Sequence, residues 1–148
     1  MSAAATAQAS GSCLCGGVRY RFGGELGPIM VCHCSRCRKA NGSAFQATSP
    51  VAKVDFQLQS GQELLAEYES SPGVFRVFCR ICASPLYSRR TATPDVLRLR
   101  IGSLDTPVAS RPALHIFTAS KAEWHDIHGD APQYAEGPTQ VPLPDQHR

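Results

Sequence analysis

The residues best suited to chemistry are cysteines, which number seven in a chain of 148 residues. They stand in three short groups instead of being scattered along the chain. The groups are the pair Cys13 and Cys15, the run "CHCSRC" that holds Cys32, Cys34 and Cys37, and the pair Cys79 and Cys82. Thiolates are common zinc ligands, and thiols spaced two or three residues apart can bind one ion together. The spacing therefore predicts metal binding.

The first and last pairs supply four thiols, which we call the quartet (Cys13, Cys15, Cys79 and Cys82). Residues two apart in an extended segment project to the same face, so Cys13 and Cys15 can reach one ion together. The C-x-x-C spacing of Cys79 and Cys82 is usual in structural zinc sites. Four thiolates fill the tetrahedral coordination of zinc and leave no position for a substrate. We expect a structural zinc that joins the start of the domain to a segment far along the chain.

The middle group, which we call the triad (Cys32, Cys34 and Cys37), has one thiol fewer than zinc usually requires. Three protein ligands and an exchangeable fourth position are the pattern of catalytic zinc. We therefore expect a second zinc at the triad and a catalytic role for its three cysteines.

Two alternatives for the triad stay open. In the first, His33 is the fourth ligand of a closed site, although an extended His33 between two ligands would point away from the ion, toward the surface or a neighbouring side chain. In the second, Cys34 and Cys37 form a redox pair without metal. The βαβ context of thioredoxin-type motifs is not visible around them, which makes the redox pair the weaker alternative.

The overall composition limits the class of protein. Hydrophobic residues make up 43% of the chain and charged residues 18%, which is typical of a globular domain. No apolar run approaches the roughly 20 residues that span a bilayer, and the first residues lack the features of a signal peptide. We expect a cytoplasmic protein without membrane contact, in which clustered thiols bind metal more often than they form disulfides. The net charge of +3 is small for a nucleic-acid binder and argues against a nucleic-acid partner.

Alternating apolar residues predict mainly β-structure, with each strand burying one face. The predicted strands are residues 18–22, 54–60, 64–70, 74–79 and 96–101. Helical signals are few: residues 35–41 are expected to form a short turn of helix, and the capping box at 120–123 predicts another. We place the core or its rim at five aromatic residues: Phe45, Phe75, Phe78, Phe117 and Trp124. His125 and His128 are expected at the surface.

The chain is expected to hold one domain, residues 11–134. A flexible N-terminal tail, 1–10, precedes it, and a Pro-rich C-terminal tail, 135–148, follows it. Along this domain run the segments "GSCLCGGVRYRF", "CHCSRCRKANGSAF", "FCRICASPLY", "IGSLD", "HIFTASKAEW" and "PQY". With these segments in this order, the sequence resembles the glutathione-dependent formaldehyde-activating enzyme (Gfa) family.

The resemblance implies a β-tent fold of twisted antiparallel sheets with short helical turns, stapled by zinc at Cys13, Cys15, Cys79 and Cys82. It also implies a second zinc at Cys32, Cys34 and Cys37. The implied activity is that of a carbon–sulfur lyase, which forms or cleaves S-hydroxymethylglutathione or a related thiol–aldehyde adduct. The partners would then be a small-molecule thiol, with glutathione as co-substrate, and an aldehyde. The alternative is a non-catalytic zinc-binding module for protein or nucleic acid.

Further residues follow from this chemistry as candidates. His33 and Ser35 are candidate proton donors. Four basic residues near the cysteines are candidates to bind the carboxylates of glutathione: Arg36, Arg38, Lys39 and Arg80. The sequence departs from the family at Ala83, where Gly is usual after the second cysteine of the late pair. Ala in a conformation that favours Gly costs about 1 kcal/mol, so we expect a strained or altered turn there.

Overall fold

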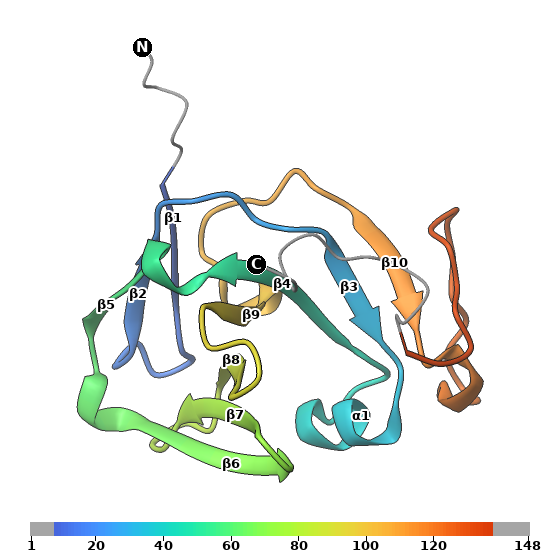
Figure 1. Cartoon of the computed structure of the whole chain (residues 1–148), viewed down its shortest axis with the longest axis horizontal. Coiled ribbons are helices and arrows are strands. Elements are labelled where there is room, and N and C mark those ends of the chain that lie inside the picture. Colours follow the sequence, from blue (N-terminus) through green and yellow to red (C-terminus); the bar gives the residue numbers. More distant parts are fainter. Residues whose placement is uncertain (1–7, 138–148) are drawn as a thin grey trace.

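Two β-sheets make up the part of the chain that the computed structural model describes, residues 8–137 (Figure 1). The smaller sheet has the strand order β1-β2-β5 and consists of β1 (Ala9–Ser12), β2 (Arg19–Phe22) and β5 (Phe56–Ser60). The larger sheet has the order β10-β3-β4-β9-β8-β7-β6. Its strands are β3 (Ile29–Cys32), β4 (Gln46–Ala52), β6 (Leu65–Ser71), β7 (Val74–Cys79), β8 (Pro85–Arg90), β9 (Val96–Arg100) and β10 (Pro112–Ile116).

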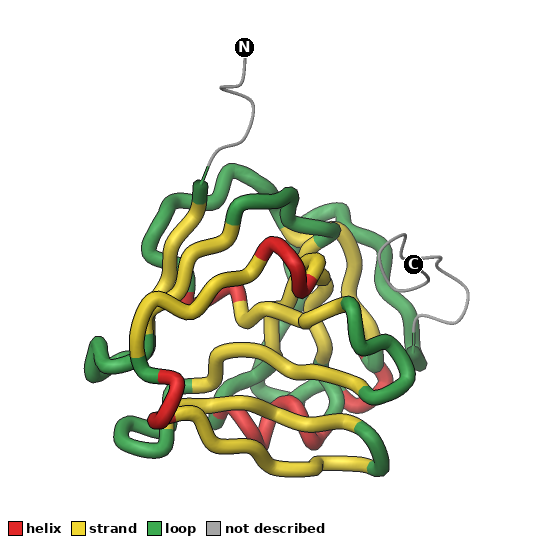
Figure 2. The backbone as a smooth tube through the Cα atoms, turned by 60° about the vertical axis from the view of Figure 1, so that its left-hand side comes forward, coloured by secondary structure: helices red, strands yellow, loops and turns green. Residues whose placement is uncertain are grey.

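Helical structure is limited to short turns beside the strands (Figure 2). The α-helix in residues 8–137 is α1 (Ser35–Asn41), which confirms the prediction for that segment. The 3₁₀ turns are η1 (Lys53–Asp55), η2 (Gln62–Leu64), η3 (Ile101–Ser103) and η4 (Thr118–Ser120). The prediction of a helix at 120–123 is wrong. The helical turn ends at Ser120, whose N–H bonds to the carbonyl of Phe117 within η4, so Ser120 closes a turn and does not begin one.

The sheets confirm the predicted fold class, a mainly β-structure of twisted sheets. Every pair of neighbouring strands is antiparallel within the described residues except β3 and β10, which run parallel. A parallel neighbour needs a crossover connection. Here the chain leaves β9, passes η3, and returns along the far edge of the sheet as β10 (Figure 1).

The alternating segments found in the sequence correspond to β2, β5, β6, β7 and β9. The other strands lack such alternation for local reasons. All four residues of β3 are buried, so its apolar run carries no period of two. Two other strands contain proline, which is rare in strands and hides them in the sequence: Pro50 lies in β4 and Pro85 begins β8.

One buried cluster lies between the two sheets and holds them together. Tyr20 and Phe22 of β2 pack with Leu97 and Leu99 of β9, and all four are at most 3% exposed. Burying such side chains contributes about 1.5 to 3 kcal/mol each. The predicted aromatic residues are more peripheral. Trp124 is 75% exposed, so its placement in the core or at its rim was wrong, and Phe45, Phe75, Phe78 and Phe117 are half-buried.

The strand β9 differs from the expectation of one buried face, because all five of its residues are buried. Leu97 and Leu99 face the smaller sheet. Arg98 and Arg100 alternate with them and therefore project from the other face, where they are 5% and 6% exposed.

Candidate functional site

The four sulfurs of the quartet converge on one point. Cys13 and Cys15 lie in the loop between β1 and β2, Cys79 ends β7, and Cys82 lies in the turn before β8. All four Sγ atoms lie within 4.8 Å of one another. The Sγ atoms of Cys13 and Cys15 are 3.6 Å apart, and those of Cys15 and Cys79 are 3.9 Å apart. Sulfurs bound to one tetrahedral zinc are roughly 3.8 Å apart, so the quartet can hold one metal ion.

Backbone amides surround the sulfurs of the quartet. The N–H of Val18 donates to Cys13 Sγ over 3.2 Å, and the N–H of Cys15 donates to Cys82 Sγ over 3.4 Å. Desolvation opposes the ionisation of Cys82, but the backbone N–H groups of Cys15 and Ser84 prevail and lower the pKa of its thiol to about 6. Such donors favour the thiolate form, which is the form that binds metal.

The turn after Cys82 contains the residue at which the sequence departs from the family pattern. Ala83 has a φ of 64°, the left-handed region that favours glycine. Its N–H donates to the carbonyl of Cys79 over 2.7 Å and closes the turn between the two cysteines. The strain expected at this position is therefore present, and the turn is kept.

Replacing Ala83 by glycine is expected to raise the free energy of unfolding by about 0.5 to 1 kcal/mol, because glycine adopts the left-handed conformation without steric cost. The measurement is urea unfolding of both proteins at the same zinc concentration. Ala113→Gly in β10 is the matched control, because Ala113 has no positive φ and should lose stability on the same change. Loss of stability in Ala83→Gly as well would contradict the assignment of strain.

The three sulfurs of the triad also lie within 4.8 Å of one another. Cys32 ends β3, Cys34 is the N-cap of α1, and Cys37 lies inside that helix. The N–H of Cys37 donates to Cys34 Sγ over 3.4 Å, so the helix start itself orients this sulfur. Cys32 and Cys37 are buried, whereas Cys34 is only half-buried. The triad can therefore hold a metal ion with its accessible side at Cys34.

An arginine completes the immediate surroundings of the triad. Arg76 of β7 places Nη2 3.8 Å from Cys37 Sγ and donates through Nη1 to Gln46 Oε1 over 2.8 Å. A hydrogen bond from Cys32, assisted by Arg76, lowers the pKa of Cys37 to about 5, although burial opposes the shift. The same hydrogen bond, together with burial, raises the pKa of Cys32. One thiolate forms readily, but three adjacent thiolates need a cation to offset their repulsion.

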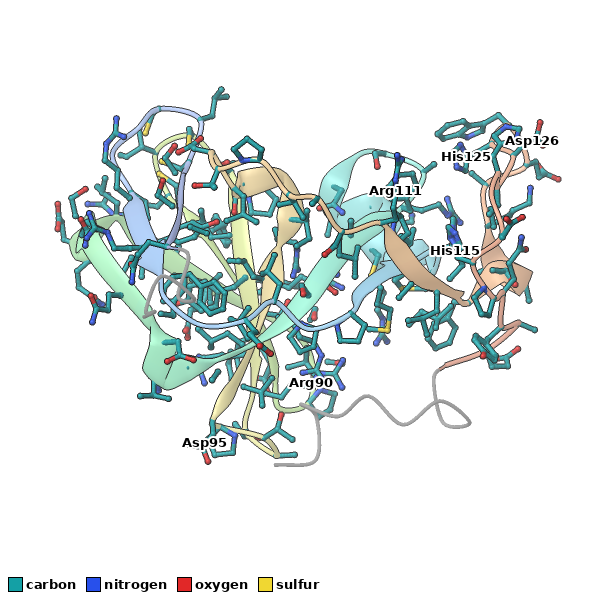
Figure 3. The ribbon with its side chains drawn as sticks, turned by 90° about the horizontal axis from the view of Figure 1, so that it is seen from above. Arg90, Asp95, Arg111, His115, His125 and Asp126 are labelled. Atoms are coloured by element: carbon teal, nitrogen blue, oxygen red, sulfur yellow. The ribbon has the colours of Figure 1, made fainter. Side chains whose placement is uncertain are left out.

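Histidines pack together beside the triad. His33 is fully buried, and its Nε2 lies 2.9 Å from Nδ1 of His115 on β10. The rings of His33 and His125 stack at 6.2 Å, and Figure 3 shows His125 on the segment beside β10. Burial, and then the charges of His115 and His125, lower the pKa of His33 to about 4. A surface position for His33 is thereby excluded. The ring nitrogens of His33 do not belong to the group of ligand atoms that can hold a metal at the triad.

His125 and His128 were expected at the surface, and only one of them is exposed. His128 is exposed, as predicted, but His125 is half-buried. Its ring lies 5.5 Å from that of Phe45 in addition to its stacking on His33. Sequence position alone gave no sign of these contacts.

The family model described as "Glutathione-dependent formaldehyde-activating enzyme" matches residues 8–120, which include the quartet and the triad. The chain belongs to this family. Its members are called Gfa proteins below.

Two further proteins are similar to this chain. An uncharacterized lyase of Schizosaccharomyces pombe is 34% identical over 77 residues, which cover 52% of this chain and 54% of that protein. The chain thus spans about half the length of the curated relative it matches. A crystal structure of a Rhodobacter sphaeroides protein has a TM-score of 0.58 at 20% identity and covers 84% of this chain and 98% of its own. At that identity the likeness supports the fold alone.

The basic residues predicted to bind the carboxylates of glutathione differ from the arginine that contacts the triad. Arg36 and Lys39 are exposed on α1, and Arg80 donates to the carbonyl of Glu63 over 3.1 Å. No hydrogen bond within residues 8–137 joins these side chains, or Arg38, to a sulfur of the triad, whereas Arg76 makes one. The sequence signal that could have identified Arg76 is an arginine in the middle of the apolar run "VFRVFC".

Within residues 8–137, no helix has the length and apolar composition needed to cross a bilayer.

Proposed function

We propose that this Gfa protein is a zinc-dependent carbon–sulfur lyase that forms or cleaves an adduct of a thiol and an aldehyde, such as S-hydroxymethylglutathione. The observation that carries the proposal is the difference between the two cysteine groups. The quartet offers four sulfurs around one point, whereas the triad offers three, one fewer than a tetrahedral metal site requires. The family description supports glutathione and formaldehyde as reactants, and the name of the Schizosaccharomyces pombe relative, an uncharacterized lyase, supports lyase chemistry.

Zinc is the metal that the donor sets favour. Thiolates are soft ligands that select zinc among the abundant divalent ions, and the sulfur separations of 3.6 and 3.9 Å in the quartet agree with tetrahedral zinc. Cys13, Cys15, Cys79 and Cys82 would hold a structural ion, and Cys32, Cys34 and Cys37 a catalytic one. Bound at the triad, zinc supplies Lewis acidity and favours the thiolate form of an incoming thiol.

The reaction itself is an addition that balances without a further reactant. The thiolate sulfur attacks the carbonyl carbon of the aldehyde, a C–S bond forms, the C=O π bond breaks, and the oxygen takes up a proton. Cleavage is the reverse. Ser35, which is exposed and follows Cys34 in the chain, is the residue that we propose to supply or accept that proton. His33 is a poor donor, because it is fully buried, neutral at neutral pH and engaged with His115.

The residues around the triad stabilise the negative charge of its thiolates. Arg76 lies against Cys37 and offsets part of the negative charge that three thiolates bring to the site. Burial of Cys32 and Cys37 keeps water from their side of the site, so a substrate is expected to approach from Cys34.

Two-dimensional exchange NMR on a mixture of formaldehyde and glutathione tests the proposal. The adduct forms unaided, so the quantity measured is the increase in exchange rate with added protein. We expect an increase proportional to the concentration of zinc-loaded protein and its disappearance when the accessible zinc is removed by a chelator. An unchanged rate with fully loaded protein would contradict the proposed activity on this pair. Salt-dependent binding of DNA or RNA by the same sample would favour a non-catalytic zinc module instead.

A further inference from the structure

The larger sheet carries a set of arginines on the face that also bears Cys32 of the triad. Residues directly opposite in antiparallel strands project to the same face. Arg76 of β7 lies opposite Ser88 of β8, and Ser88 lies opposite Arg98 of β9. Arg90 and Arg100 follow Ser88 and Arg98 by two residues and share their face. We call these four residues, Arg76, Arg90, Arg98 and Arg100, the arginine face.

The register also connects the arginine face to the triad. Arg100 lies opposite Thr48 of β4, and Gln46, two residues before Thr48, lies opposite Cys32. The side-chain contacts agree with this alternation, because Arg76 reaches both Gln46 Oε1 and Cys37 Sγ. The arginine face and the triad thus form one continuous surface.

No carboxylate balances this charge in the part of the chain that the structure describes. The ion pair found there joins Arg89 and Glu67, and Arg89 projects from the opposite face of β8. The nearest acidic residue along the chain, Asp95, lies at the tip of the β8–β9 hairpin, well apart from Arg90 in Figure 3. Four guanidinium groups therefore lie on adjacent strands without an acidic partner among residues 8–137.

Two of these guanidinium groups are buried and incompletely bonded. Arg98 is 5% exposed and its Nη1 has no hydrogen-bond partner, and Arg100 is 6% exposed and its Nε has none. Leaving charged donors buried and unpaired destabilises the folded state. A zinc ion held by the three thiolates of the triad would give that site one net negative charge, which would offset only one of the four positive charges. The remaining charge and the free donors call for an anion.

We propose that the arginine face binds the carboxylate of the small-molecule substrate whose reactive end lies at the triad. A guanidinium is a planar fork that pairs with the two oxygens of a carboxylate, and Arg98 and Arg100 present such forks from one strand. Arg90 is the member of the arginine face that is exposed to solvent. Burial is the main cause of the lowered pKa of Arg98, with repulsion by Arg90 adding to it, which agrees with a positive charge that lacks a counterion. The proposal rests on the proposed function and assigns the binding of the substrate's carboxylate to the arginine face.

Titration of the zinc-loaded protein with glutarate, followed by calorimetry or by protein NMR, tests the proposal without any reaction. Glutarate has two carboxylates and no thiol, and its diamide, glutaramide, is the neutral control. We expect saturable binding of glutarate and none of glutaramide. Inorganic phosphate is the third arm, because a carboxylate site should bind glutarate more tightly than phosphate.

Variants identify the residues involved. Arg90→Gln changes an exposed residue and Arg98→Lys keeps the charge but removes the fork, so both should fold. Each is expected to weaken glutarate binding by about 10-fold or more. Arg89→Gln, on the other face, is the matched control and should bind as the unchanged protein does. Binding that survives Arg90→Gln and Arg98→Lys, or equal binding of phosphate or glutaramide, would overturn the proposal.

The glutarate titration and the formaldehyde–glutathione exchange experiment can fail independently of each other. Glutarate binding without accelerated exchange would leave the arginine face intact and refute the formaldehyde activity. Accelerated exchange without glutarate binding would refute the arginine face and keep the lyase.

Discussion

Cys79→Ser is expected to leave the protein without a cooperative folded state under conditions in which the unchanged chain folds. The Cys79 sulfur is fully buried and lies 3.9 Å from that of Cys15, so its loss removes one of the four donors of the quartet. Structural zinc contributes about 10 to 16 kcal/mol to small metal domains, which is as large as the whole stability of an ordinary domain, about 5 to 15 kcal/mol. The serine hydroxyl is not ionised at neutral pH and does not replace the thiolate.

The measurement is thermal and urea unfolding by circular dichroism, together with elemental analysis for zinc. Chelation of zinc from the unchanged protein should produce the same loss of the unfolding transition, which serves as an independent check. A Cys79→Ser protein that unfolds cooperatively at the original midpoint would show that the quartet is not a structural metal site.

Cys34→Ser is expected to keep the fold, lose one zinc ion per chain and lose the acceleration of formaldehyde–glutathione exchange. Cys34 is the N-cap of α1, and its sulfur accepts the N–H of Cys37. Serine is a preferred N-cap residue and can accept the same hydrogen bond, so the helix should persist. Removing mere outer partners of metal ligands already costs about 10- to 100-fold, so loss of a ligand should reduce the protein-dependent exchange rate by more than about 100-fold.

The readouts for Cys34→Ser are the unfolding midpoint, the zinc content and the exchange rate on one preparation. Cys79→Ser is the contrasting variant, because it should lose the transition itself. If Cys34→Ser unfolds as severely as Cys79→Ser, the triad is a structural site and its catalytic role fails. If it keeps full exchange activity with a single zinc, the reaction occurs elsewhere.

The cysteine groups were predictable because their geometry is local. Two thiols separated by one or two residues are close in almost any backbone, and the count of four against three distinguishes a closed site from an open one. The helix α1 could be predicted for the same reason, because the residues that cap it, Cys34 and Gly42, directly flank the helical residues in the sequence. The strands with clear alternation, such as β2 and β7, were recovered as well.

What could not be predicted depends on long-range pairing. The arginines of β9 looked like the solvent face of an alternating strand, and only the register with β4 and β8 shows that they are buried beside the triad. Likewise, His33 meets His115 through the parallel pairing of β3 with β10, residues 82 positions apart. Trp124 was assigned to the core by its type, but it lies on a surface turn.

The distance along the chain between the two halves of the quartet has a consequence for synthesis. Cys15 and Cys79 are separated by 64 positions. At the usual translation rate of about 5 to 20 residues per second, Cys13 and Cys15 emerge from the ribosome roughly 3 to 13 s before their partners. During that interval the nascent chain carries a pair of unprotected thiols, open to oxidation or to a competing metal. The zinc supply at the moment of translation, more than the supply afterwards, should therefore decide how much protein matures.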